Sequence, residues 1–208
     1  MIESPVKEQV SSREKTLFDL DQFFIKERVG FMKMRNVYDI LDLSSGSQVG
    51  IAQEDTAAWV LALSFFINRR LLPATLVISK EKDGEPLVRL HRKLSLVGLV
   101  DIKDAQGQKI GMFKSKMFSF KCNFRIFDVN NNQIGEVKGD WKGWNFKIVN
   151  AEGMEIGTIT KKWAGLGKEL FTSADNYVVS LKENSTPAQK LLLLAAGIAI
   201  DTVYKEKK

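Results

Sequence analysis

A run of ten residues without a polar side chain, at 191–200, most limits the folds open to this chain. It contains only Leu, Ala, Ile and one Gly, and it lies between Lys190 and Asp201. A helix that is apolar on all sides belongs in a bilayer or in the middle of a core. A bilayer-spanning helix needs roughly 20 apolar residues, whereas a run of about 10–14 is more typical of a buried helix. The length therefore favours a core helix over 187–204, with a tail anchor as the alternative.

A recurring pattern predicts the walls around that helix. Four segments each contain Ile, then Asp or Asn two residues later, then a turn, and finally Ile or Val followed by Gly. The alternation before the turn places apolar side chains on one face of a strand, and Asp, Asn and Gly favour tight hairpin turns. The closing Gly allows a β-bulge or a close approach of another backbone. The four segments are 37–50, 99–111, 123–135 and 145–157.

Successive hairpins form an antiparallel meander, and a long meander removes its exposed edges by closing into a barrel. Residues 82–86, KDGEP, predict another turn of the same kind. We therefore expect a mainly β fold, in which a closed antiparallel barrel of about twelve strands encloses the C-terminal apolar helix. Residues 1–16 are expected to be a polar lead-in, and 17–208 a single domain.

One apolar segment, 54–72, interrupts the meander. It predicts an extra helix at about 55–70, with Asp55 or Thr56 as its N-cap and Pro73 as its stop. Two readings remain open. The helix either packs against the barrel, on its outside or across a mouth, or lies in a membrane interface with Arg69 and Arg70 at headgroup level.

The charge of the chain is positive and uneven. There are 31 Lys and Arg against 25 Asp and Glu, a net charge of +6, and the excess falls wholly after residue 80. Such a surface attracts anionic lipid or nucleic acid at long range, although the same charge also serves solubility. The single cysteine excludes an intramolecular disulfide and a cysteine metal cluster, and the first residues contain no apolar signal region. A cytoplasmic protein is the expectation.

Residues 157–181, GTITKKWAGLGKELFTSADNYVVSL, followed by the apolar helix, resemble the C-terminal part of phospholipid scramblases. The four hairpins and WKGWNFKI at 141–148 are similar to the wider set that includes the LURP-one-related proteins. The resemblance covers 17–204, and 159–177 is its most specific part. It implies the tubby C-terminal fold, a closed barrel of twelve antiparallel strands threaded by a C-terminal apolar helix.

The calcium-binding segment of scramblases is altered in this chain. It runs twelve residues from the first Asp of Asp-Ala-Asp-Asn-Phe, but here Ser173 stands at the opening position and Asn184 at the closing one. Asp175 is then the remaining carboxylate ligand. Calcium takes six to eight oxygen ligands, several of them carboxylates. The resemblance therefore implies a weakened calcium site at Ser173, Asp175 and Asn184, and no other cofactor is expected.

The sequence carries no recognised catalytic pattern. His91 is the only histidine, it belongs to the basic predicted strand LVRLHRKL, and no Ser or Cys partner for it is visible. A phosphate-binding Gly loop, HExxH, CxxC and a nucleophile elbow are all missing from the sequence. Structural roles at turns or strand ends are expected for Asp101, Asp104, Asp128 and Asp140. We therefore expect a protein that is not an enzyme and has no small-molecule substrate.

Basic residues fall on neighbouring predicted strands, which makes a basic stripe on the barrel possible, although solvated outward positions explain them equally well. The candidate lipid-binding or anion-binding residues are Arg69, Arg70, Arg89, Arg92, Lys93, Lys114, Lys116, Lys161 and Lys162. The first hypothesis is a peripheral protein that binds anionic phospholipid headgroups or a membrane-associated protein partner. The second is a phospholipid scramblase. The third, nucleic-acid binding, rests on the charge and on Trp141 and Trp144 taken as exposed, and no recognised motif supports it.

Overall fold

The computed structural model describes residues 15–28, 35–67, 71–94, 98–115, 122–140, 144–161, 176–183 and 185–204. Its strands are β1 Gln22–Glu27, β2 Val37–Asp42, β3 Gln48–Glu54, β4 Ala74–Ser79, β5 Pro86–Arg92, β6 Gly98–Asp104, β7 Lys109–Ser115, β8 Cys122–Phe127, β9 Gln133–Asp140, β10 Asn145–Asn150, β11 Glu155–Thr160 and β12 Tyr177–Leu181. Its helices are the short 3-10 helix η1 Leu17–Asp19, α1 Ala58–Leu63 and α2 Pro187–Tyr204.

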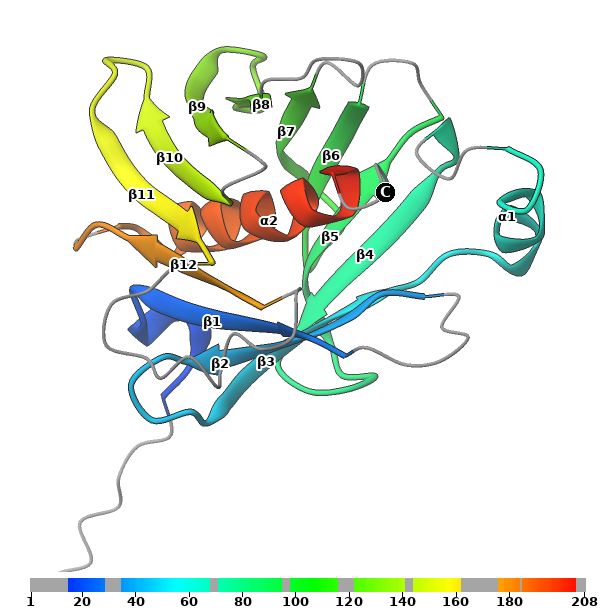
Figure 1. Cartoon of the computed structure of the whole chain (residues 1–208), viewed down its shortest axis with the longest axis horizontal. Helices are drawn as coiled ribbons and strands as arrows, with labels where there is room; N and C mark the ends of the chain where they lie inside the picture. Colours follow the sequence, from blue (N-terminus) through cyan, green and yellow to red (C-terminus); the bar gives the residue numbers. More distant parts are fainter. Residues whose placement is uncertain are drawn as a thin grey trace, which may run out of the picture.

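The twelve strands form a closed antiparallel barrel in chain order, and β1 completes the ring by pairing with β12 (Figure 1). The predicted fold class is confirmed. Strands that follow one another in the chain are also neighbours in the sheet, so short turns suffice for most of the ladder. Because the ring is closed, the described sheet presents no free strand edge for pairing with another chain.

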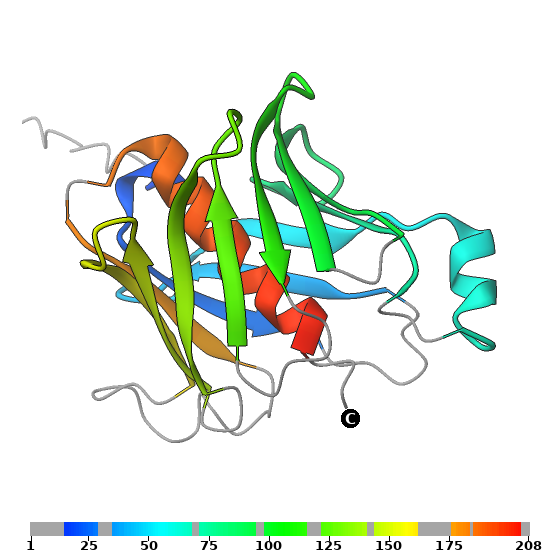
Figure 2. The same ribbon diagram turned by 90° about the horizontal axis from the view of Figure 1, so that it is seen from above.

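Helix α2 runs through the lumen of the barrel (Figures 1 and 2). Pro187 stands at its first turn, and Thr186 and Gln189 form a capping box with bonds of 2.8 and 3.3 Å. Residues 192–200 are all buried, against the inward-facing side chains of the strands. The apolar run is therefore the core helix that its length predicted. Among the described residues, none of the helices is long and apolar enough to cross a bilayer.

The four repeated segments form the hairpins β2–β3, β6–β7, β8–β9 and β10–β11, and each has a bulge just before its closing Gly. The Ile of each segment pairs with that Gly, as Ile126 does with Gly135. A Cβ on Gly135 would lie 2.9 Å from the carbonyl oxygen of Val149 on the next strand. Both predicted roles of the closing Gly, the bulge and the close approach, are confirmed.

The turns of three hairpins use the same side-chain bond. A backbone N–H four residues further on donates to the Asp or Asn at a distance of 2.8 Å. The acceptors are Asp104, Asp128 and Asn150. The structural role predicted for the two aspartates is therefore confirmed, and Asn150 shows that the turn needs the side-chain oxygen and not the charge.

The two ends of the barrel differ in their connections. The tight turns 43–47, 80–85, 105–108, 128–132 and 151–154 lie at the end where α2 begins, which we call the hairpin mouth. The other connections join strand ends where α2 ends, at what we call the loop mouth. They are 28–36, 55–73, 93–97, 116–121, 141–144 and 161–176.

The extra helix is shorter than predicted. Helix α1 spans only Ala58–Leu63, turns follow it to residue 67, and residues 71 and 72 are not α-helical. Its N-cap is Ala57, without a side-chain cap bond, so the expected cap at Asp55 or Thr56 is wrong. The hydroxyl of Ser64 donates to a carbonyl of the last turn at 2.6 Å. Such local bonds compete with helix continuation, which fits the early end.

Candidate functional site

Five of the nine basic candidates lie among the described residues. Arg69, Arg70, Lys116 and Lys162 lie outside them, as do the calcium candidates Ser173, Asp175 and Asn184. The five described candidates are Arg89, Arg92, Lys93, Lys114 and Lys161.

Arg92 faces inward at the loop mouth and is buried, so it does not belong to a basic stripe on the outer wall. Its Nε donates to the carbonyl of Leu72 at 3.2 Å, which ties β5 to the end of the α1–β4 connection. The alternation of β5 explains the difference, because inward positions alternate with outward ones and Arg92 has the parity of the core residues Val88 and Leu90.

Lys93 is paired with a carboxylate. Its Nζ lies 2.6 Å from Asp101, and Lys109 reaches the other oxygen of the same carboxyl at 2.9 Å. Burial alone would raise the pKa of Asp101, but the two ammonium groups outweigh it and lower that pKa. Asp101 lies within β6, so the expectation of a turn or strand-end position for this residue is wrong.

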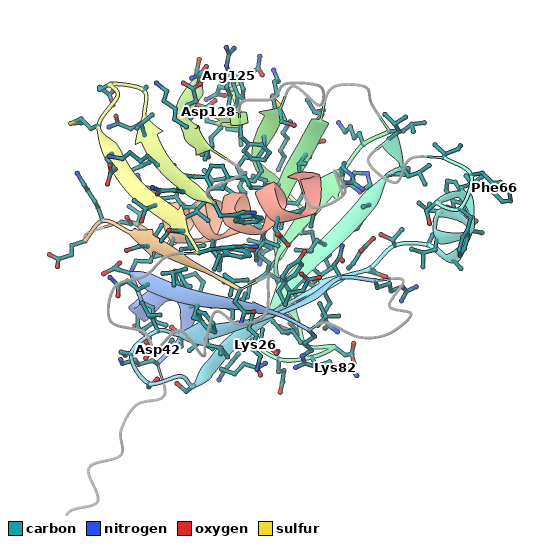
Figure 3. The ribbon with its side chains drawn as sticks, viewed as in Figure 1. Lys26, Asp42, Phe66, Lys82, Arg125 and Asp128 are labelled. Carbon is teal, nitrogen blue, oxygen red and sulfur yellow. The ribbon has the colours of Figure 1, made fainter. Side chains whose placement is uncertain are left out.

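The outer wall of the barrel carries charges of both signs. Arg89 and Lys114 face outward, and each donates a hydrogen bond to a nearby turn, at 3.4 and 3.0 Å. Across the strands, Lys114 pairs with Arg125, and Arg125 pairs with Glu136. Figure 3 shows Arg125 and Asp128 together at one edge of the molecule, well away from α1. A continuous basic stripe is therefore not present over the described strands.

Trp144 is part of the packing and not an exposed stacking platform. It is half-buried, and its ring lies 5.8 Å from that of Phe146 and 5.4 Å from that of Tyr177. The Nζ of Lys161 lies 4.0 Å from the Trp144 ring, in a cation–π arrangement. The expectation of an exposed Trp144 is wrong, and Trp141 lies outside the described residues.

Large apolar side chains are exposed together on one projection at the loop mouth. Helix α1 and the turns after it stand away from the barrel (Figures 1 and 2), and Phe66 lies at the far end of this projection (Figure 3). The exposed fractions are 62% for Trp59, 75% for Phe65, 88% for Phe66 and 41% for Ile67. We call these four residues the apolar tip.

Helix α1 also has a buried side. Val60 and Leu61 of α1 are buried, so the helix packs through one face and exposes the other. A guanidinium nitrogen of Arg35 donates to the carbonyl of Thr56 at 3.0 Å and so lies at the base of the projection. The sequence from residue 56 to 67 contains no charged residue, and Arg69 and Arg70 follow it.

Sequence reasoning identified the segment but not the individual tip residues. Three aromatic residues within an uncharged stretch were the available signal. Which of them face water depends on which side of α1 is buried, and the stretch itself does not show this.

Charge is separated between the two mouths. In the sequence, the loop-mouth connections and residues 205–208, which follow α2, contain fifteen Lys or Arg and four Asp or Glu. The hairpin-mouth turns, with 15–21 and 182–186, contain four Lys or Arg and eight Asp or Glu. The strands and α2 contain ten of each. In the sequence, the basic excess thus falls in the segments that connect strand ends at the loop mouth. Of these fifteen basic residues, Arg28, Arg35, Lys93 and Lys161 lie among the described residues.

Buried polar groups close the loop mouth from inside. The Tyr38 hydroxyl donates to Asp201 at 2.9 Å, and both residues are fully buried. Burial and the nearby Asp201 charge raise the pKa of Tyr38 well above its usual value. Glu54 accepts bonds from the Asn36 N–H and the Thr56 hydroxyl at 3.0 and 2.9 Å. A cavity of about 30 Å³ beside the end of α2 has room for water and not for a lipid chain.

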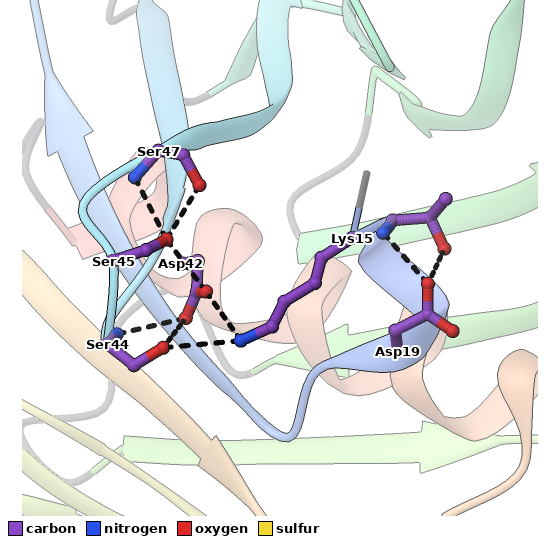
Figure 4. A network of polar contacts seen from close by, with 7 residues as sticks. Lys15, Asp19, Asp42, Ser44, Ser45 and Ser47 are labelled. Carbon is purple, nitrogen blue, oxygen red and sulfur yellow. Dashed lines mark hydrogen bonds and ion pairs between the residues drawn. The ribbon is translucent and has the colours of Figure 1, made fainter. Parts of the chain in front are cut away.

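The hairpin mouth holds a polar network around Asp42 (Figure 4). The carboxyl of Asp42 accepts bonds from the Ser44 N–H and hydroxyl, the Ser45 hydroxyl and Lys15. Burial acts to raise the pKa of Asp42, but these bonds outweigh it and hold the pKa well below its usual range. A depression of about 340 Å³ beside it is lined partly by Asp19, Asp21 and Glu183. Over the described ranges, no cluster of three or more potential ligands could hold a metal ion.

The calcium candidates are separated by a described strand. Between Asp175 and Asn184 the chain forms β12, which pairs with β1 and β11. A strand rises about 3.3 Å per residue, so β12 extends over roughly 16 Å. A calcium loop instead curves around its ion and offers several oxygens to it. Because the three candidate ligands themselves lie outside the described residues, weak calcium binding stays a prediction.

Comparison with known proteins gives one match. A family model described as Scramblase matches residues 5–207. No curated protein and no solved structure matches the chain. The matched range includes all twelve strands, the apolar tip and α2.

Proposed function

Because this chain belongs to the scramblase family, as the resemblance of residues 157–181 implied, we propose that it binds anionic phospholipid surfaces through its loop mouth. Membership of the family gives it a scramblase-related role, and the scramblase family is not a family of enzymes. The proposed protein is accordingly a non-enzymatic peripheral one. Its partner is the lipid headgroup layer or a protein held at that layer.

One observation carries this proposal: the apolar tip lies at the mouth whose connecting segments hold the basic excess of the sequence. Basic residues near an anionic leaflet contribute about 1 kcal/mol each, and apolar side chains beside them partition into the interface. The acidic connections of the hairpin mouth face the other way along the barrel axis. An anionic surface therefore attracts one end of the molecule and repels the other.

Co-sedimentation with vesicles tests the proposal. We expect binding to vesicles of phosphatidylserine and phosphatidylcholine at low salt, weaker binding at high salt, and little binding to phosphatidylcholine alone, because salt screens the attraction. The double variant R69E/R70E should bind at least about tenfold more weakly. The control K82E/K182E changes the net charge by the same amount at the hairpin mouth and should bind nearly as well as the unaltered protein.

Two results would contradict the proposal. No binding of the unaltered protein at low salt would remove the lipid partner and leave a protein partner at the membrane. An equal loss in both charge variants would show that total charge matters and that the loop mouth is not the binding face.

Phospholipid scrambling is a second candidate, which family membership favours. A fluorescent-lipid transfer assay in proteoliposomes decides it. Transfer at the rate of protein-free vesicles would reject scrambling and leave the binding proposal intact.

A further inference from the structure

We propose that the apolar tip inserts between the lipid headgroups and anchors the barrel end-on, with the loop mouth on the bilayer. This inference rests on the proposed function and adds the depth and orientation of binding. It assigns the contact to Trp59, Phe65, Phe66 and Ile67, none of which belongs to the basic candidates.

The exposure of the tip is concentrated as well as large. Other exposed apolar side chains, such as Leu94, Val129 and Met154, stand at separate turns. The tip instead gathers four of them within nine residues of the chain. Scattered exposed apolar residues are ordinary, whereas a contiguous group marks a contact with a protein, a ligand or a membrane.

The backbone N–H groups at the end of the tip are already paired by internal hydrogen bonds. The N–H groups of residues 64–67 donate to carbonyls of α1, with distances from 2.9 to 3.3 Å. A segment that enters a lipid environment must not carry unpaired backbone donors, since each costs several kcal/mol. Because no residue from 56 to 67 is charged, insertion also desolvates no charge. The N–H groups of residues 64–67 and the uncharged side chains of the segment therefore favour a position among the headgroups.

The order of side chains along the tip suits an interface. Trp59 lies on α1, and Phe66 follows it in the chain and lies at the far end of the projection (Figure 3). Trp favours the headgroup level, where its ring is partly wet, and Phe favours the apolar region below. In this orientation Arg35, whose guanidinium contacts Thr56 at the base of the projection, would lie near the lipid phosphates.

The charge around the tip selects a bilayer over a second copy of the chain. A symmetric dimer through the tip would bring two loop mouths together, since such interfaces use the same patch twice. The connections of each loop mouth carry a large positive excess, so the two copies would repel one another. An anionic leaflet offers the complementary charge to the same surface.

Vesicle partitioning of the double variant F65S/F66S tests the inference. We expect its partition coefficient on phosphatidylserine-containing vesicles to fall at least about tenfold, because two large apolar side chains no longer leave water. The control V129S/M154S removes two side chains that are 55% and 59% exposed at the hairpin mouth. It should bind within about twofold of the unaltered protein. The ratio of the partition coefficients of F65S/F66S and the unaltered protein should stay the same at high salt, because salt screens charges and does not weaken the burial of apolar side chains.

The depth of insertion has a separate readout. Lipids brominated at different acyl carbons quench tryptophan by contact, and the difference between the unaltered protein and W59F isolates Trp59. We expect quenching to be strongest when bromine lies near the headgroup end of the chain.

The outcomes separate the two proposals. If the unaltered protein does not bind anionic vesicles, the proposed function fails. If it binds and F65S/F66S binds equally well, insertion is overturned while lipid binding stands. A lipid-free dimer in sedimentation velocity that F65S/F66S abolishes would assign the tip to self-association and also overturn the inference.

Discussion

Asp42 illustrates how a single carboxylate organises a turn. It ends β2, and it collects hydrogen bonds from two serines of the turn and from Lys15, which precedes η1. These bonds favour the ionised carboxylate in the folded chain, which is why the pKa of Asp42 is lowered despite burial. The unfolded chain lacks them. Ionised Asp42 therefore stabilises the folded state at neutral pH.

The first stability prediction concerns D42N. We expect a loss of about 1–3 kcal/mol in the free energy of unfolding at pH 7, because several charge-assisted bonds are weakened. Since the folded pKa is depressed, this stabilisation is present above the unfolded pKa, about 3.9, and is lost as the pH falls toward the folded pKa. Urea denaturation at pH 7 and at pH 3 should therefore show a smaller difference between D42N and the unaltered protein at pH 3.

The control for that experiment is D104N. Asp104 accepts one backbone bond in its turn, and Asn150 already fills the corresponding position in another hairpin. We expect D104N to change the free energy of unfolding by less than about 0.5 kcal/mol. A pH-independent difference for D42N would contradict the account of Asp42.

At the scale of elements, α2 is held at both ends as well as along its length. At the hairpin mouth Lys190 lies 2.9 Å from Asp21 and donates to the carbonyl of Phe18 at the same distance. At the loop mouth Asp201 accepts the Tyr38 hydroxyl. In the sequence these two residues bound the apolar run, and in the structure they lie at the two mouths of the barrel.

The hydrogen bond between Tyr38 and Asp201 can be tested with a matched pair of variants. Tyr38 and Tyr177 are both fully buried in the core, but within the described residues the Tyr177 hydroxyl has no hydrogen-bond partner. We expect Y38F to lower the free energy of unfolding by about 1–3 kcal/mol, because it removes a donor from a buried carboxylate. Y177F should change it by less than about 0.5 kcal/mol. Equal losses in urea denaturation would show that the Tyr38–Asp201 bond has no special role.

At the scale of the whole molecule, closure needs both ends of the chain. The ring is completed by β1 with β12, and the lumen is filled by α2, which is among the last residues. The buried side chains of nearly every strand belong to one core with α2. Removing the helix would leave an apolar lumen open to water, which is a large loss of buried area.

We therefore expect a chain that lacks residues 187–208 to show no cooperative unfolding transition. A synthetic peptide of residues 186–204 added in trans should restore the transition, because the walls and the core are complementary. The same peptide with Leu194→Lys should not, since Leu194 is fully buried. Near-UV circular dichroism during urea titration is the measurement. A native-like transition in the truncated chain alone would contradict the role of α2 as core.

Local chemistry explains what could be predicted from the sequence. The hairpin frames specify their own turns through Asx bonds, positive-φ positions and closing glycines, and these contacts lie within about fifteen residues. The apolar run of α2 likewise predicts its own burial, because a helix that is apolar on all sides has no face for contact with water. Fold class, turn positions and the core helix follow from such short-range patterns.

The candidate site was harder because exposure depends on residues far away in the chain. The inward position of Arg92, the packing of Trp144 and the pairing of Lys93 with Asp101 are each decided by strand register or by a neighbouring element. The same holds for α1, where Val60 and Leu61 are buried while the side chains of the apolar tip are exposed.

The sequence by itself determined a meander of hairpins and a helix that must be enclosed, since both arise from the order of neighbouring residues. Only the tertiary structure decided which end of the barrel is basic and carries the apolar tip. Closing twelve antiparallel strands sends alternate connections to opposite mouths, and the segments that hold the charge excess of the sequence thereby all connect strand ends at one mouth.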